Sequence, residues 1–122
     1  MGNGTRPVAE RSGLRKRIRS VNSNWEFDVT LLALADLSEA EEWYSKEASA
    51  LGARFVRSFE AQLERICRNP YKYPRVYLNL RRAVMPDFPY NVLFAAEDGW
   101  VTVVACVHQR RDPKDWQERA QP

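Results

Sequence analysis

The chain has few of the residues that metal and nucleotide sites require. Its 122 residues include one histidine, two cysteines and five glycines. Cys67 and Cys106 lie inside apolar runs, and neither has a second cysteine or a histidine at the spacing of a zinc ligand. No glycine-rich phosphate-binding loop is present. We therefore expect two buried, reduced thiols, no metal site and no cofactor.

Long hydrophobic runs are also missing. No apolar stretch approaches the roughly 20 residues that a membrane-spanning helix needs. The N-terminus is basic but lacks the apolar h-region of a secretory signal, so we expect a cytoplasmic protein with no membrane partner. A hydrophobic content of 44% is nevertheless ample for one core, and a chain of 122 residues suits a single folded domain.

The positive charge is concentrated at the N-terminus. Residues 1–24 have a net charge of +5, whereas residues 25–122 have a net charge of −2. The first segment shows little apolar periodicity, which is typical of a flexible basic arm. It could contact nucleic acid or an acidic partner electrostatically, or it could be an artificial extension or follow a start codon chosen too far upstream. We place the folded domain at residues 25–122.

The spacing of apolar residues changes along this domain. Residues 25–31 alternate apolar and polar, which predicts a strand with one buried face. In residues 34–51 and again in 55–67, apolar residues recur every three or four positions, which predicts two amphipathic helices. Thr30 is a candidate cap for the first helix. A short break at Gly52 predicts that the two helices form an antiparallel hairpin.

Strand patterns follow the second helix. Asn69-Pro70 ends that helix, and residues 76–84 are a predicted strand. The apolar runs 90–96 and 100–107 are joined by a turn at Asp98-Gly99, which predicts a β-hairpin because such turns need a positive φ. The three strands are consecutive, so we expect them to form an antiparallel meander.

The order of elements defines the fold class. It is strand-helix-helix-strand-strand-strand, with a helical turn near residues 115–119. We predict an α+β fold in which the first strand joins a small antiparallel sheet and the helical hairpin packs on one face.

Short motifs occur along these elements in a defined order. They are Ala35-Asp36-Leu37, Trp43-Tyr44, Leu51-Gly52 with Phe55, Asn69-Pro70, Arg82, Phe88-Pro89-Tyr90, His108-Gln109-Arg110-Arg111-Asp112-Pro113, and Trp116. Their order and spacing resemble the RelE/ParE superfamily of type II toxin–antitoxin toxins, also known as plasmid stabilisation proteins. The resemblance covers about residues 25–119. It implies a toxin that forms a hetero-oligomer with a cognate antitoxin, whose C-terminal segment wraps around it.

The resemblance leaves two kinds of target open, because a shared fold does not fix the chemistry. RelE-like members are ribosome-dependent mRNA endonucleases. ParE-like members poison DNA gyrase and are not known as nucleases. A third interpretation is an inactive member that still binds an antitoxin.

RNA cleavage needs groups that move protons and cations that stabilise the phosphate. His108 could serve as base or acid, and Tyr90 as a proton donor or stacking surface. Arginines could clamp the phosphate, although Arg81 and Arg82 point to opposite faces of a strand and only one can join a site. The candidate residues for a nuclease are therefore His108, Tyr90, Arg81, Arg82, Arg110 and Arg111.

Each candidate also has a structural interpretation. A lone histidine at a strand end often bonds the nearby backbone, and Arg82 could simply pair with Asp87 or Asp112. The domain is slightly acidic, whereas a protein working among ribosomal RNA gains affinity from a basic domain. The chain also lacks the C-terminal, tyrosine-containing basic stretch of some RelE-like nucleases. We therefore favour a ParE-like toxin that binds DNA gyrase over one that acts on ribosomes and mRNA.

Overall fold

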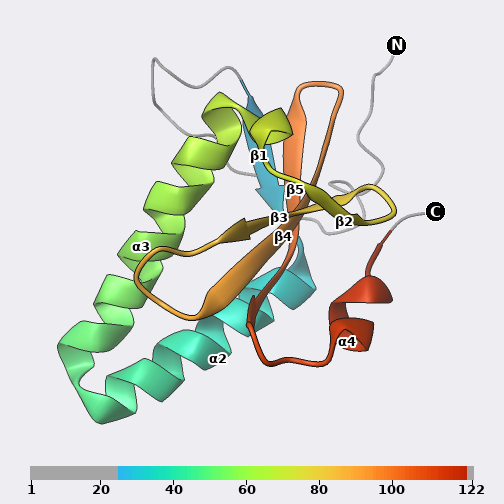
Figure 1. Cartoon of the computed structure of the whole chain (residues 1–122). Helices are drawn as coiled ribbons and strands as arrows, with labels where there is room; N and C mark the ends of the chain where they lie inside the picture. The colour runs from blue at the N-terminus through green and yellow to red at the C-terminus, as the bar shows by residue number, and fades with distance from the viewer. Residues whose placement is uncertain (1–24, 121–122) are drawn as a thin grey trace.

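The computed structural model describes residues 25–120, and the arm predicted for residues 1–24 lies outside this range. Within this range, nine elements follow one another (Figure 1). They are β1 (Glu26–Val29), α2 (Leu31–Glu47), α3 (Ser49–Arg68), the 3₁₀ turn η1 (Pro70–Lys72), β2 (Arg75–Tyr77), β3 (Leu80–Val84), β4 (Tyr90–Glu97), β5 (Trp100–His108) and α4 (Pro113–Gln117). Among the described residues, no helix is both long and apolar enough to cross a membrane.

The strands form one five-stranded sheet in the order β1-β5-β4-β3-β2. The predicted meander is confirmed, because β3, β4 and β5 pair antiparallel in sequence order. The first strand joins this sheet as predicted, but it runs parallel to β5, so the sheet is mixed rather than wholly antiparallel. Local sequence does not encode this direction. It follows from the helical hairpin, which carries the chain away from β1 before the other strands begin.

The two faces of the sheet carry separate apolar clusters. The helical hairpin covers one face, where Phe55, Ile66 and Phe94 are fully buried in the larger cluster. The short helix α4 covers the other face with Trp116, which packs against Leu80 and Leu93. Figure 1 shows the two long helices on one side of the sheet and α4 on the other. The predicted α+β fold with a helical hairpin on one face is therefore confirmed.

The hairpin bend differs from the prediction. The helices are separated at Ala48, which has an extended backbone, and Gly52 lies within α3. A Cβ atom at Gly52 would lie 2.8 Å from the carbonyl oxygen of Glu41, so glycine allows α2 and α3 to approach closely. The other predicted signals hold, since the Thr30 side chain accepts a bond from the Ala33 amide and α3 ends at Arg68, just before Asn69-Pro70.

The predicted strand at residues 76–84 is divided in two. A turn at Leu78 separates β2 from β3, and Leu78 has a φ of 51°, which is uncommon for a residue other than glycine. The sequence contains no glycine there, so the turn carried no recognisable signal. The turn between β4 and β5 does match the prediction, with positive φ at both Asp98 and Gly99.

Candidate functional site

A β-bulge in β5 sets the direction of the residues at the end of that strand. Leu93 pairs with Ala105 and Phe94 pairs with Val103, so Val104 is an extra residue without a partner in β4. Val101 and Val103 face the helical hairpin, and strict alternation would continue through residues 105 and 107. The bulge shifts this phase by one, and bulges commonly redirect side chains in this way. As a result Cys106, rather than Ala105, faces the hairpin.

Two backbone groups of β5, one at the bulge and one just after it, are bound by one buried ion pair. The Cys106 amide donates a hydrogen bond of 3.0 Å to Asp36 of α2, and Arg119 donates one of 2.9 Å to the Val104 carbonyl oxygen. Asp36 and Arg119 also pair with each other at 2.7 Å, and both side chains are largely buried. Because buried backbone groups need partners, this pair stabilises the bulge. It also links α2, β5 and the segment that follows α4.

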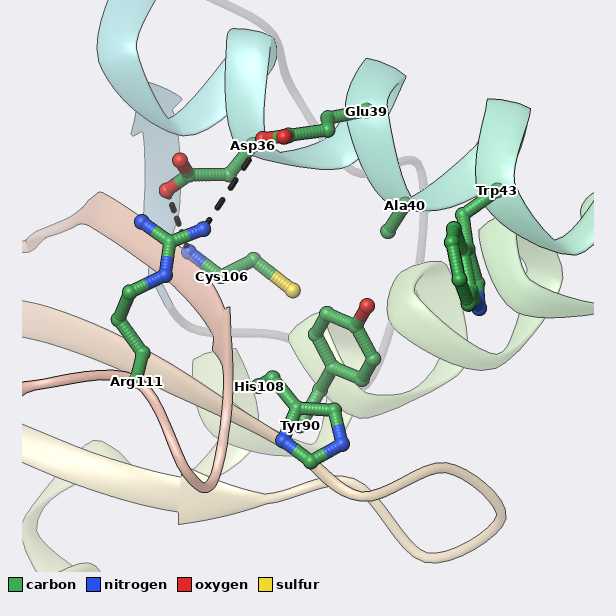
Figure 2. Close-up of a pocket in the computed structure, with 8 residues that line it drawn as sticks. All are labelled: Asp36, Glu39, Ala40, Trp43, Tyr90, Cys106, His108 and Arg111. Carbon is green, nitrogen blue, oxygen red and sulfur yellow. Dashed lines mark hydrogen bonds and ion pairs between the residues drawn. The ribbon is translucent and has the colours of Figure 1, made fainter.

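Beside this pair lies a recess of about 150 Å³ between α2 and the ends of β4 and β5. Figure 2 shows Tyr90 and His108 side by side below α2, with their ring centroids 5.3 Å apart. Arg111 reaches toward Glu39 across the recess, with 3.9 Å between their charged atoms. The recess is lined by Asp36, Glu39, Ala40, Trp43, Tyr90, Cys106, His108 and Arg111.

The His108 side chain closes the turn that follows β5. Its Nδ1 accepts a hydrogen bond of 3.0 Å from the Arg110 amide, and the Arg111 amide bonds to the His108 carbonyl oxygen. A neutral imidazole with an acceptor at Nδ1 carries its proton on Nε2, so it has no second lone pair to act as a base. The histidine therefore has a local structural role of the kind expected for a strand end.

Tyr90 is held in its neutral form. Burial raises the pKa of Tyr90 to about 12, and the neighbouring Tyr44, Cys106 and Glu39 add to the increase, while Arg111 opposes it. Burial and Asp36 likewise raise the pKa of the Cys106 thiol above its usual range. Both cysteines are free and buried, as predicted. Neither the phenol nor the thiol near the recess is activated as a nucleophile.

The predicted arginines do not converge on the recess. Only Arg111 lines it, and this residue also pairs with Asp115 at 3.4 Å. Arg81 lies on the hairpin face of β3 and donates a 2.6 Å bond to the Tyr73 carbonyl oxygen. Arg82 is exposed and, within residues 25–120, forms no ion pair with Asp87 or Asp112. The structure thus brings together Tyr90, His108 and Arg111 at the recess, while Arg81, Arg82 and Arg110 do not line it.

Sequence reasoning missed Asp36 and Arg119 as a pair. They are 83 residues apart, and the alternation of β5 gives no sign of the bulge that they bind. The motif Ala35-Asp36-Leu37 contained one possible signal, because its acidic residue stands between two apolar residues of a predicted helix. Its partner is visible only once α4 is placed against the sheet.

A second concavity lies on a neighbouring face of α2. It is an apolar groove of about 410 Å³ between β1, α2 and α3. Seven of the residues that line it are apolar, and Glu41 and Glu60 are the charged residues among them. The lining residues are Phe27, Val29, Leu34, Leu37, Ser38, Glu41, Val56, Phe59, Glu60 and Leu63. Within the described residues, no cluster of three or more histidine, cysteine or acidic residues could hold a metal ion.

Comparison with known proteins establishes the family. A family model described as "ParE toxin of type II toxin-antitoxin system, parDE" matches residues 27–113. The chain therefore belongs to the ParE toxin family of type II toxin–antitoxin systems.

A solved structure described as "Chromosomal ParDE TA system from P. aeruginosa" shares the fold with a TM-score of 0.63. The two chains are 13% identical, and the match covers 70% of this chain and 96% of the other. No curated protein matches the chain.

Proposed function

We propose that this toxin arrests growth by binding DNA gyrase, and that it does not cleave mRNA on the ribosome. The observation that carries the proposal is the hydrogen bond from the Arg110 amide to Nδ1 of His108. This bond occupies the lone pair that a general base would use. The one histidine of the chain is thus part of a turn, which argues against its use as the general base of RNA cleavage.

The charges around the recess agree with this proposal. A nuclease must stabilise a phosphate whose negative charge increases in the transition state. Arg111 is the one cation that lines the recess, and its charge is offset by Glu39 and Asp115. The high pKa of Tyr90 also makes this phenol a poor proton donor for a leaving oxygen. Inhibition by binding to an enzyme requires none of these groups.

The antitoxin is the second partner, and the apolar groove suits one of its helices. Grooves of this kind bind amphipathic helices through apolar residues that recur every three or four positions. Leu34, Leu37 and Val56 line the groove from two helices, and Glu41 at its edge could pair with a basic residue of the antitoxin. Capture in this groove would explain a stable hetero-oligomer of toxin and antitoxin.

The target can be tested with the purified full-length protein and two substitutions at one position. Gyrase supercoiling assays should show inhibition or accumulation of cleaved DNA, and mRNA on programmed ribosomes should remain intact. His108→Ala should keep gyrase inhibition within a few-fold. His108→Asn is the matched control, because its side-chain oxygen can accept from the Arg110 amide without an imidazole ring.

Three outcomes separate the interpretations. Site-specific mRNA cleavage that falls by about 10²–10⁴ in both His108 variants would show that the imidazole is catalytic and would contradict the proposal. Inhibition of gyrase that survives in His108→Asn would support it. A protein that binds its antitoxin but affects neither gyrase nor translation would be an inactive member of the family.

A further inference from the structure

The charge of the domain is distributed very unevenly. Residues 65–86 contain six basic and no acidic residues, whereas the remainder of residues 25–122 contains seven basic and fifteen acidic residues. The net charge of −2 is therefore an average over a strongly basic segment and an acidic remainder. Five of the six cations lie at the end of α3, on η1, and on the hairpin face of β2 and β3. We call this group the basic surface: Arg65, Arg68, Lys72, Arg75 and Arg81.

Contacts around two tyrosines hold this surface together. The Arg81 guanidinium lies 5.1 Å from the ring centroid of Tyr71 and donates to the carbonyl oxygens of Tyr71 and Tyr73 at 3.5 and 2.6 Å. Lys72 lies 5.5 Å from the Tyr73 ring. The positive charge of Arg65 acts on the Tyr73 hydroxyl and partly opposes the rise in the pKa of Tyr73 that burial causes. Arg75 is the register partner of Arg81 across the β2–β3 pair.

These cations are not neutralised within the described part of the chain. Among the five, Arg68 alone forms an ion pair there, with Glu64 at 3.8 Å, and both side chains are substantially exposed. The Tyr71 ring is 58% exposed beside Arg81. Both bonds of the Arg81 side chain use Nη1, so its other donors point to no acceptor within residues 25–120. The surface therefore offers ordered donors and positive charge to a ligand.

We propose that the basic surface binds the phosphate backbone of duplex DNA. Arginine, lysine and tyrosine, the residue types exposed here, are among the side chains that contact phosphate oxygens. A cluster of cations on one side of an otherwise acidic domain is the usual electrostatic footprint of a nucleic-acid site. The choice of duplex DNA rests on the proposed gyrase target, because gyrase acts on duplex DNA.

An acidic protein segment is a less suitable ligand for this surface. The cores of protein interfaces are apolar and depleted of charged residues, although arginine and tyrosine are enriched in interfaces as a whole. The apolar groove, which meets that description, lies elsewhere, between β1, α2 and α3. The two surfaces thus suit two partners of different chemistry, and the toxin could hold DNA at one and protein at the other.

The test is direct binding of the full-length protein to a fluorescein-labelled duplex of about 30 base pairs. Fluorescence anisotropy would be measured over a series of salt concentrations for the wild type and for a variant with Arg65→Ala, Lys72→Ala and Arg75→Ala. Each lost phosphate contact should reduce the slope of log affinity against log salt by about 0.9, so the variant's slope should fall by about 2 to 3. Its affinity at low salt should fall at least tenfold.

A matched control removes the same charge from another place. The variant with Lys46→Ala, Arg54→Ala and Arg57→Ala changes exposed residues in the last turn of α2 and the first half of α3. It should keep the wild-type slope to within about one phosphate contact. Residues 1–24 are the same in all three proteins, so their charge cannot produce a difference. The assay contains no gyrase. If the gyrase proposal failed, the assay would therefore still show whether the basic surface binds DNA.

Several results would overturn the inference. They are a wild type that does not bind the duplex at 50 mM salt, equal losses in the two triple variants, and an RNA oligonucleotide that binds more tightly than the duplex through the same three residues. Loss of antitoxin capture with unchanged DNA binding would assign the surface to the protein partner instead.

Discussion

Two neighbouring faces of α2 differ in the contacts that their residues make. On one face, Asp36 and Glu39 are engaged with Arg119, Arg111 and the bulge of β5. On the other face, the apolar side chains of Leu34 and Leu37 line the groove. The contacts at the recess thus connect parts of the protein, whereas the groove is a surface available to another molecule. A pocket that contains a histidine, a tyrosine and an arginine is not necessarily a catalytic site.

Breaking the ion pair between Asp36 and Arg119 should have the largest effect on stability. In Asp36→Ala, Arg119 keeps a buried charge without its partner, and the Cys106 amide loses its acceptor. Removing one member of a buried pair commonly costs about 3–5 kcal/mol, so we expect a loss of this size in the free energy of unfolding. Chemical denaturation followed by tryptophan fluorescence would measure it.

The matched control for this prediction is Asp36→Asn, which keeps an acceptor for the Cys106 amide but removes the charge. It should cost less than Asp36→Ala. A double variant, Asp36→Ala with Arg119→Ala, should be more stable than the sum of the two single losses predicts. A loss below about 1 kcal/mol in Asp36→Ala would show that the bulge does not need this pair.

Changing the groove should affect the antitoxin more than the fold. Leu37→Glu places a charge among apolar residues where an antitoxin helix would pack, so affinity should fall at least tenfold, or about 1.4 kcal/mol. Titration calorimetry with the cognate antitoxin would measure the change. Leu32→Glu is the control, because Leu32 is 57% exposed and does not line the groove. Equal losses in the two variants would place the antitoxin elsewhere.

The smallest effect concerns Tyr90 and appears only at high pH. Its folded pKa of about 12 lies above the ordinary value of 10, so the folded state holds the phenol proton more tightly than the unfolded state. The stability contributed by the neutral phenol is complete below pH 10 and is lost as the pH rises toward 12. Tyr90→Phe should make the fall in stability over this range shallower. An unchanged pH profile would show that the tyrosine is not shielded from water.

Periodicity in the sequence predicted most of the elements, because each depends on contacts between neighbours along the chain. The two helices have apolar residues every three or four positions, and the Asp98-Gly99 turn has the positive φ that the sequence suggested. The family resemblance, based on motifs such as Phe88-Pro89-Tyr90, was confirmed by the family model. The turn at Leu78 was missed, since a leucine gives no signal for positive φ.

Average charge was a less reliable guide than local charge. The net −2 of residues 25–122 favours a target other than ribosomal RNA, although residues 65–86 contain no acid at all. That segment is visible in the sequence. Its importance depends on the packing of α3, η1 and β3, which places Arg65, Lys72 and Arg81 around Tyr71 and Tyr73 and which no local pattern specifies.

Periodicity, turns and motif order are properties of short stretches of chain, and they were enough to predict the helices, most of the strands and the family. The candidate site depends instead on tertiary packing. The bulge at Val104 turns Cys106 toward α2, and the pair of Asp36 and Arg119 binds backbone groups at the bulge and just after it. These contacts join residues 70 and 83 positions apart. Such pairs form only when packing brings distant segments together and their buried polar groups must find partners.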